Sequence, residues 1–428
     1  MKKDAGVRLL FLLAMFGVLW AFVVAGCSDD DGEVPPPLEK VNGDDQVGET
    51  GRELPDPVAV RVRDAEGTGV EGATVAFAVT GGGGTLSESS VLTDSDGEAS
   101  VRWTLGSPPV WNRVRASVEG DDVEFVAWAN PGEKPELNVL LQGGGFEFAN
   151  EDLAFGEGRG LFLGSPGAIL NMPAPGASPV EIDLAGESIE SPTGIAFGPT
   201  GDLYVCENAE PGKSVKQVHP SGESGILSEG FAGSPFALPN HMAVHSSGDI
   251  YLSSTCDQMI YRISPATGET TEFLSIPGPN GLALDAQEAY LYILTENPAV
   301  FCIPNPSVWG GLYRVPLGPG GEAGELEALV EGFALAGDGL AFDEEGNLYV
   351  VFSGYIDLDF GRLAESSVFV YTPDGRFHEF FGVNVLQGEI ITNIAFGAEP
   401  FDPESLYCYG FMGRLYRVEV GIAGLPLP

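Results

Sequence analysis

The chain has 428 residues and a formal net charge of −42 at pH 7, so it is long enough for two or three domains. A strongly acidic surface repels phosphate groups and attracts cations, which argues against nucleic acid as a partner. The 60 glycines, 32 prolines and 43% hydrophobic residues, with no long stretch of helical periodicity, indicate an all-β protein of short strands and tight turns.

The first 26 residues have the pattern of an export signal. Basic residues precede an apolar run, and Val24-Ala25-Gly26-Cys27 resembles the lipobox of bacterial lipoproteins. An uncleaved anchor helix is the alternative, but the run is short for a membrane span and small residues stand directly before the cysteine. We therefore expect residues 1–26 to be a lipoprotein signal peptide. Lipidated Cys27 would then tie the chain to a membrane of the cell envelope.

Two segments of different character follow. Residues 27–55 are acidic, rich in Pro and Gly and poor in large apolar residues, which is typical of a disordered tether. Residues 56–130 alternate apolar and polar positions between turns such as Asp94-Ser95-Asp96-Gly97, a pattern that predicts a β-sandwich. With Gly72-Ala73-Thr74-Val75-Ala76-Phe77, this stretch resembles the bacterial Ig-like domains of invasin and intimin type, and we expect it to be a spacer.

After a linker at 131–136, residues 137–428 contain a repeat. Asn280-Gly281-Leu282-Ala283-Leu284 has five altered copies, mostly followed by a turn and a second short strand such as Gly201-Asp202-Leu203-Tyr204-Val205. Repeats of about 40–50 residues with several strands each predict a β-propeller, here with six blades. The copies begin at Glu151, Thr193, Asn240, Asn280, Asp338 and Thr392.

The last repeat has only three candidate strands, at 393–396, 406–409 and 414–420. A ring of blades is stable only when its two ends are joined. We therefore expect the short apolar segment Leu137–Leu141 to supply the fourth strand of the last blade.

The first residues of the six repeats are candidates for a functional site. In a propeller the residue before each innermost strand lies at the mouth of the central channel. All six residues carry a side-chain oxygen, and hard divalent cations prefer oxygen ligands. Asn and Asp are also frequent in tight turns for backbone reasons, so the ring alone leaves a metal site and plain turn chemistry equally open.

From about Leu137 onward the chain resembles the SMP-30/gluconolactonase/LRE-like family of six-bladed propellers. The resemblance rests on Glu151, Asn240, Pro279-Asn280-Gly281 and Asp338-Gly339. It implies that Glu151, Asn280 and Asp338 bind one divalent cation, with calcium first and magnesium, manganese or zinc as alternatives. It also implies that Asp338 doubles as a general base in lactone hydrolysis. Asn240, and with it Thr193 and Thr392 of the ring, would face a lactone, ester or carbohydrate-like ligand.

The sequence departs from that family at three places. Leu238 stands where the family has a substrate-orienting Arg, His241 replaces an Asp, and the proline of the first-blade motif is absent. His241 is a candidate acid, base or substrate-orienting group, with a partly buried structural histidine as the alternative. Glu190-Ser191-Pro192 is a second match to the first-blade motif, ranked below Glu151 because it falls in the second repeat.

Four cysteines remain after Cys27. Cys256 and Cys302 follow second strands of neighbouring blades, so we expect them to pair, with four free thiols as the alternative. The chain thus has three candidate functions. The first is an exported metal-dependent hydrolase of a lactone or related ester. The second is a non-catalytic metal-containing binding propeller on an Ig-like stalk. The third and weakest is an adhesin.

Overall fold

The computed structural model describes residues 38–106, 111–118, 120–130, 137–142, 151–184, 188–210, 212–299, 302, 309–354, 356–357, 362–363, 365–384 and 390–427. The signal peptide, Cys27 and the 131–136 linker lie outside these residues. Every regular element among them is a β-strand, as expected. No helix in the described part of the chain is long and apolar enough to span a membrane.

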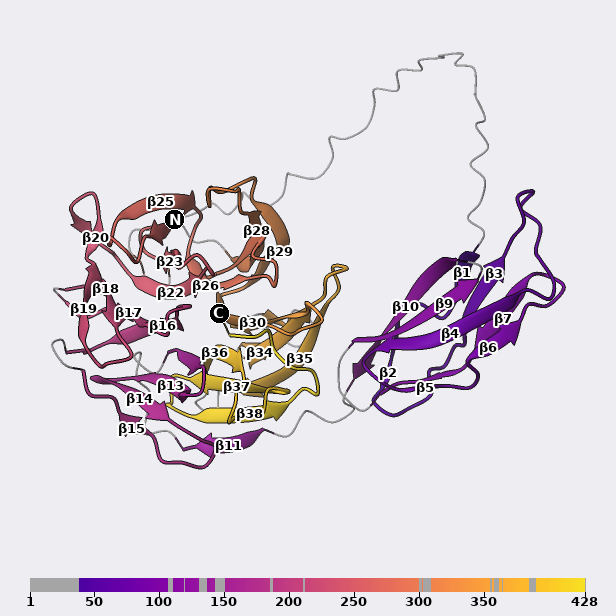
Figure 1. Ribbon diagram of the computed structural model, residues 1–428, viewed down its shortest axis with the longest axis horizontal. Helices are drawn as coiled ribbons and strands as arrows, with labels where there is room; N and C mark the ends of the chain where they lie inside the picture. Colours follow the sequence, from indigo (N-terminus) through magenta and orange to yellow (C-terminus); the bar gives the residue numbers. More distant parts are fainter. Residues whose placement is uncertain are drawn as a thin grey trace, which may run out of the picture.

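The N-terminal domain is a β-sandwich (Figure 1). Val58, Val60 and Trp103 are completely buried, as the alternating pattern requires. In the turn at residues 94–97, Asp94 Oδ1 accepts the N–H groups of Asp96 and Glu98 at 2.9 and 3.0 Å. The sheets are β1 (Leu38–Asn42), β3 (Val58–Val62) and β7 (Glu98–Val101); β2 (Gln46–Glu49), β10 (Asp121–Asn130), β9 (Trp111–Val118), β4 (Thr74–Gly81) and β6 (Ser90–Leu92); and the pair β5 (Thr85–Leu86) and β8 (Trp103–Thr104).

The sandwich begins earlier than expected, because strands β1 and β2 lie within the segment predicted to be a disordered tether. Strand β1 pairs antiparallel with β3, and β2 pairs in parallel with the end of β10. Leu38 and Leu54 are buried in the domain core. The prediction that the ordered domain starts at residue 56 is therefore wrong. Strands β1 and β2 are edge strands that form backbone hydrogen bonds to sheets whose apolar core comes from later residues.

The C-terminal domain is a ring of six four-stranded sheets (Figure 1). The blades are β12 (Leu153–Gly156), β13 (Gly160–Ser165), β14 (Ala168–Met172), β15 (Val180–Glu181); β16 (Pro192–Phe197), β17 (Leu203–Glu207), β18 (Ser214–Val218), β19 (Ser224–Ser228); β22 (Pro239–Val244), β23 (Ile250–Ser254), β24 (Met259–Ile263), β25 (Thr270–Ser275); β26 (Pro279–Leu284), β27 (Tyr290–Thr295), β28 (Gly310–Pro316), β29 (Glu327–Ala334); β30 (Ala336–Phe342), β31 (Leu348–Ser353), β34 (Glu365–Tyr371), β35 (Phe377–Asn384); and β36 (Ile391–Phe396), β37 (Ser405–Gly410), β38 (Leu415–Glu419), β11 (Asn138–Leu141). Two short pairs are β20 (Gly230–Phe231) with β21 (Ser234–Pro235), and β32 (Ile356–Asp357) with β33 (Arg362–Leu363).

The predicted ring closure is confirmed. Strand β11 pairs antiparallel with β38, with Asn138 opposite Arg417 and Val139 opposite Tyr416. The last blade is thus completed by the segment that precedes the first one. The C-terminus lies near the centre of the ring (Figure 1), where the Leu425 N–H donates to Phe342 O at 3.1 Å.

Aromatic residues of the repeat hold neighbouring blades together. Tyr349 of the fifth blade packs edge-on against Phe396 of the sixth, with ring centroids 5.2 Å apart. Tyr407 of the sixth blade meets Phe155 of the first at the same distance of 5.2 Å. Such pairs contribute about 0.5–1.5 kcal/mol beyond the burial of their area. The repeating Phe and Tyr positions in the sequence are therefore the inter-blade contacts.

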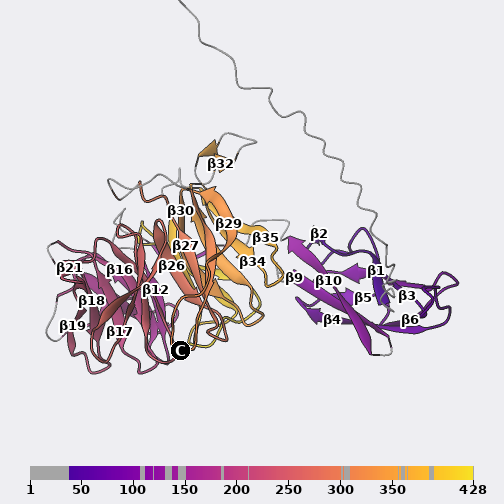
Figure 2. The ribbon, with the colours of Figure 1, turned by 90° about the horizontal axis from the view of Figure 1, so that it is seen from above.

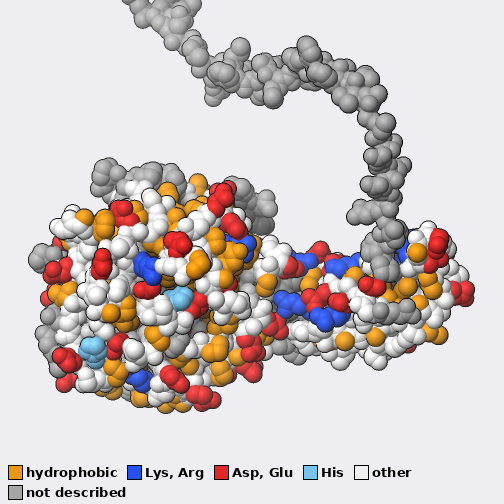
Figure 3. Space-filling view, turned by 45° about the horizontal axis from the view of Figure 1, so that its top comes forward, with side chains coloured by type: hydrophobic (Ala, Val, Ile, Leu, Met, Phe, Trp, Pro, Cys, Tyr) orange, Lys and Arg blue, Asp and Glu red, His pale blue; other side chains and the backbone are white. Residues whose placement is uncertain are grey.

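The sandwich packs against the outer side of the fifth blade, beside β34 and β35 (Figure 2). Arg113 Nη1 lies 2.6 Å from Glu345 Oε2, and Arg376 Nε donates to Asp45 Oδ1 at 2.6 Å. Val126 of the sandwich belongs to the apolar cluster of the fifth and sixth blades. Acidic side chains are spread over both domains in the surface view (Figure 3), in keeping with the net charge.

Candidate functional site

Five of the six innermost strands share an irregularity at the residues predicted to form the ring, whereas β12 pairs regularly with β13. Pairing skips between Pro239 and Met242 in β22 and between Pro279 and Leu282 in β26. Strands β16, β30 and β36 show the same shift at their own ring residues. A bulge re-aims a side chain, so these shifts turn the ring residues toward the channel mouth.

A pocket of about 600 Å³ opens at this mouth and brings five of the six ring residues together. Thr392 is the exception, because it is completely buried and its hydroxyl donates to Tyr409 O at 3.1 Å. Thr193 lines the pocket, but its hydroxyl is engaged with Pro239 O at 2.7 Å. The lining comprises Glu151, Ser191, Thr193, Asn208, Lys213, Ala237, Leu238, Asn240, Cys256, Asn280, Glu296, Leu335, Ala336, Asp338, Ser353, Gly354, Ile390 and Phe411.

The pocket also contains a carboxylate that the repeat analysis did not single out, Glu296. It follows directly after β27 and is 3% exposed. Burial raises the pKa of Glu296 to about 8, although a hydrogen bond from the Asn280 side chain opposes the shift. The signal that could have found it is its position directly after the second strand of a blade, because that strand runs back toward the mouth.

The acidic groups in the pocket destabilise one another's charged forms. Burial, followed by the charges of Asp338 and Glu296, raises the pKa of Glu151 well above its ordinary value. Burial and the charge of Glu296 do the same to the pKa of Asp338, against a hydrogen bond from Asn280. Without a compensating positive charge, burial and mutual repulsion favour the protonated forms of these carboxylates.

The donor set suits a hard cation in its chemistry. Asn280 bonds to both Glu296 and Asp338, yet its own Oδ1 is buried and has no hydrogen-bond partner. An unpaired buried carbonyl oxygen costs about 1–3 kcal/mol, which a cation ligated by that oxygen would recover. Among the described residues, no three His, Cys, Asp or Glu side chains converge as metal ligands do. The predicted ligands are instead two carboxylates, Glu151 and Asp338, and the Asn280 amide.

His241, a candidate acid, base or substrate-orienting group, does not line the pocket at the mouth. One residue deeper than Asn240, it lines a second cavity of about 630 Å³ at the opposite end of the channel. The Leu282 N–H donates to His241 Nδ1 at 3.2 Å, and His241 Nε2 lies 3.3 Å from the Asn393 amide nitrogen and 4.0 Å from Asp152 Oδ2. Burial lowers the pKa of His241 to about 4. Its position supports the structural alternative.

Asp152, His241 and Asn393 together form a polar layer across the middle of the channel. Asp152 accepts the N–H groups of Ile195 and Leu153 at 2.6 and 2.7 Å, and the Asn393 amide as well. Glycines occupy the remaining positions of the layer, where neighbouring strands lie too close for a side chain. A Cβ at Gly281, for example, would lie 1.8 Å from Asp338 O. The layer separates the pocket at the mouth from the second cavity.

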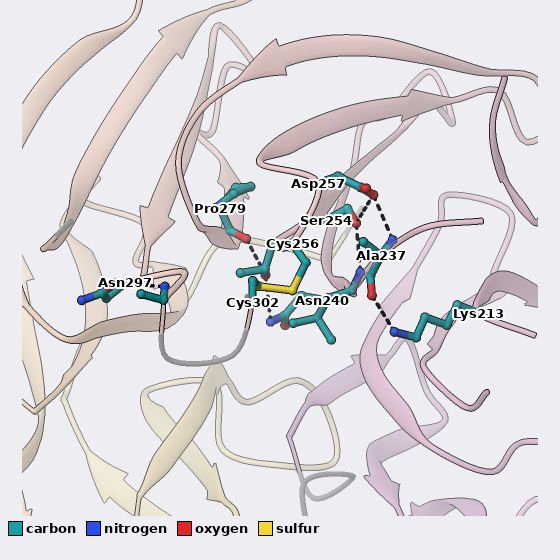
Figure 4. Close-up of a disulfide and its surroundings, with 12 residues drawn as sticks. Lys213, Ala237, Asn240, Ser254, Cys256, Asp257, Pro279, Asn297 and Cys302 are labelled. Atoms are coloured by element: carbon teal, nitrogen blue, oxygen red, sulfur yellow. Dashed lines mark hydrogen bonds between the residues drawn. A yellow bond between two sulfur atoms is a disulfide. The ribbon is translucent and has the colours of Figure 1, made fainter. Parts of the chain in front are cut away.

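The expected disulfide between Cys256 and Cys302 is present at the mouth (Figure 4). It joins the loop after β23 to the long loop after β27, which begins with Glu296. Cys206 and Cys408 are buried and free. The bond therefore fixes the loop that carries the additional carboxylate.

Known proteins share this fold. A gluconolactonase of Zymomonas mobilis is 23% identical over 226 residues, which is 48% of this chain and 57% of that relative. The chain thus spans little more than half of the curated relative. The structure of a gluconolactonase from Xanthomonas campestris aligns with a TM-score of 0.50 and 17% identity over 67% of this chain and 90% of that one. A candidate gluconolactonase of known structure aligns with a TM-score of 0.50 and 18% identity, over 68% of this chain and 94% of that one.

The propeller is similar in sequence to a gluconolactonase and shares its fold with gluconolactonase structures. This confirms the resemblance inferred from the repeat and the six-bladed fold. The sandwich has a separate relationship: residues 55–126 match the family model of the bacterial Ig-like domain, group 1. Relative to the gluconolactonase-like pattern of our sequence analysis, the pocket keeps Glu151, Asn240, Asn280 and Asp338 and adds Glu296.

Proposed function

We propose that the propeller is a divalent-cation-dependent hydrolase of a lactone or related ester. The observation that carries this proposal is Asn280, whose buried Oδ1 lacks a partner while its amide bonds to Glu296 and Asp338. Glu151, Asn280 and Asp338 would hold the cation, with calcium as the first candidate. When bound, it would polarise the ester carbonyl and lower the pKa of a water molecule.

The side chains of the chain supply the remaining functions. Asp338 would accept the proton of the attacking water, because it lines the pocket and a bound cation would favour its ionised form. The Asn240 amide, held by the Thr255 hydroxyl at 3.4 Å, orients the ligand from the third blade. Leu238, Leu335 and Phe411 provide apolar walls that exclude water around the ring of the lactone.

The test combines elemental analysis with turnover. The purified protein should retain about one divalent cation per chain and hydrolyse a member of a panel of aldonolactones and aryl esters. Removal of the cation on a chelating resin should stop turnover, and adding it back should restore it. Asp338→Ala should lose both cation and turnover. Full turnover by Asp338→Ala would exclude this mechanism.

A non-catalytic binding propeller is the second candidate, and the observation in its favour is Leu238. An apolar side chain lines the pocket where we expected an arginine in a lactone-hydrolysing relative. Under this proposal the cation and a ligand bind, but no lactone of the panel is cleaved. Tight ligand binding without turnover would favour it over the hydrolase.

We also propose that the mature protein is a lipoprotein of the cell envelope, anchored through Cys27. The support is the signal-like start of the sequence. Mass spectrometry of the mature N-terminus should find a diacylglyceryl group on Cys27, and Cys27→Ser should release the protein from the membrane fraction. Unmodified Cys27 in a membrane-bound mature chain would contradict the anchor.

A further inference from the structure

The pocket at the mouth contains an isolated basic side chain. Among its described lining residues, Lys213 is the only lysine or arginine. It comes from the loop between β17 and β18 of the second blade. In a ring of six blades the second lies across from the fifth, which carries Asp338. The pocket therefore has a positive side and a negative side.

The Lys213 ammonium group is held in place with donor capacity remaining. Its Nζ donates to Ala237 O at 2.6 Å, and the Ala237 N–H in turn donates to Asp257 Oδ2 at 3.0 Å (Figure 4). The nearest carboxylate, Glu210, lies 3.2 Å away but is 79% exposed, whereas the Lys213 side chain is 19% exposed. An ammonium group has three N–H donors, so one remains after these two partners.

Asn208, in the same loop as Lys213, contributes an unpaired hydrogen-bond acceptor to this side of the pocket. Its Oδ1 is buried and has no hydrogen-bond partner. The loop is held by buried Glu207, which accepts the N–H groups of Ser191 and Ala209 at 2.8 and 3.1 Å. Lys216 lies 3.6 Å from Glu207 and balances its charge, so the charge of Lys213 is not needed there.

We propose that Lys213 and Asn208 form a subsite for a hydroxy acid: the ammonium group binds a carboxylate and the Asn208 oxygen accepts a neighbouring hydroxyl. The protein carries a net charge of −42, so an anion is held in this pocket only by direct contact with a cation. A ligand bound in this way points its other end toward Asn280 and Asp338. The role of this subsite in substrate specificity rests on the proposed function. If the propeller hydrolyses lactones, the subsite selects those that carry a free carboxylate.

The test measures binding without cation or turnover, so it is independent of whether the propeller is a hydrolase. Protein stripped on a chelating resin is titrated calorimetrically with glucarate, and with glucitol, which has the same carbon chain without carboxylates. We expect glucarate to bind at least tenfold more tightly than glucitol. Lys213→Met should weaken glucarate binding by about 10- to 100-fold and leave glucitol unchanged, because hydrogen bonds to charged groups contribute this much.

Two variants control for unrelated effects. Lys40→Met removes a charge from the Ig-like domain, where Lys40 is paired with Asp44 at 2.6 Å, and should bind glucarate like the wild type. Lys213→Gln keeps an N–H donor without the charge, and decides the question if Lys213→Met does not fold. Equal binding of glucarate and glucitol by the wild type, or unchanged glucarate binding in the folded Lys213 variant, would overturn the subsite.

Discussion

Substitution of Glu296 by Gln should stabilise the cation-free protein at alkaline pH. The pKa of Glu296 is about 8 against an ordinary 4.5, so between these values the folded state holds a proton that the unfolded state has released. Because the folded state binds more protons, the free energy of unfolding falls as pH rises through this window. The shift is 8 − 4.5 = 3.5 units. At pH 7, which is about 2.5 units above the unfolded pKa, only about 2.5 units of this shift contribute. At about 1.4 kcal/mol per unit, the free energy of unfolding is lowered by on the order of 3 kcal/mol.

The assay is urea unfolding of metal-stripped wild type and Glu296→Gln at pH 5, 6, 7 and 8. The variant should gain little at pH 5 and about 3 kcal/mol or more at pH 7 to 8, since Gln also relieves the repulsion of Glu151 and Asp338. Glu269→Gln, at an exposed position, should follow the wild type throughout. The reasoning is refuted if Glu296→Gln is no more stable than the wild type at pH 8.

Three further predictions concern other parts of the molecule. Removing the disulfide by Cys256→Ser should lower the free energy of unfolding by about 4 kcal/mol in the loop-entropy account, given the 46-residue separation to its partner; an unchanged urea midpoint would contradict the bond. His241 has a folded pKa of about 4 against 6.5 unfolded, so the unfolded state binds more protons between these values and stability should be lost as pH falls from 6.5 toward 4. His241→Asn should flatten that loss, and an identical acid profile would show that His241 is not buried in its neutral form. Arg376→Glu should loosen the packing of the two domains, seen as a larger radius of gyration by X-ray scattering, and Asp45→Arg in the same chain should restore it; compact Arg376→Glu protein would show that the pair does not hold the domains together.

The repeat in the sequence could predict the propeller because its period reflects physical contacts. The Phe near the end of most innermost strands and the Tyr of most second strands meet across neighbouring blades, as Tyr349 and Phe396 do. The last repeat lacks a fourth strand, and a ring of blades must be closed, so the segment at 137–141 could be predicted to complete it. These features depend on local pattern and ring geometry, and both are readable in one sequence.

The parts that could not be predicted depend on partners far away in the chain. Strands β1 and β2 lie in an acidic segment rich in Pro and Gly, and they fold because β3 and β10 bind their backbones. Glu296 lies outside the repeated motif, and only the folded ring brings it to Asn280. His241 follows a ring residue by one position, but the bulge in β22 sends the two side chains to different cavities.

The strand that closes the ring has a mechanical consequence. Strand β11 is the first propeller strand after the Ig-like domain, so a pull on the N-terminal end reaches the ring at the seam between β11 and β38. Peeling β11 away would leave the sixth blade one strand short and open the toroid at that edge. If the chain is tethered at Cys27, the ion pairs of Arg113 and Arg376 with their partners would take up load before the seam does. The contact between the domains would then protect the ring from being opened by a pull on the tether.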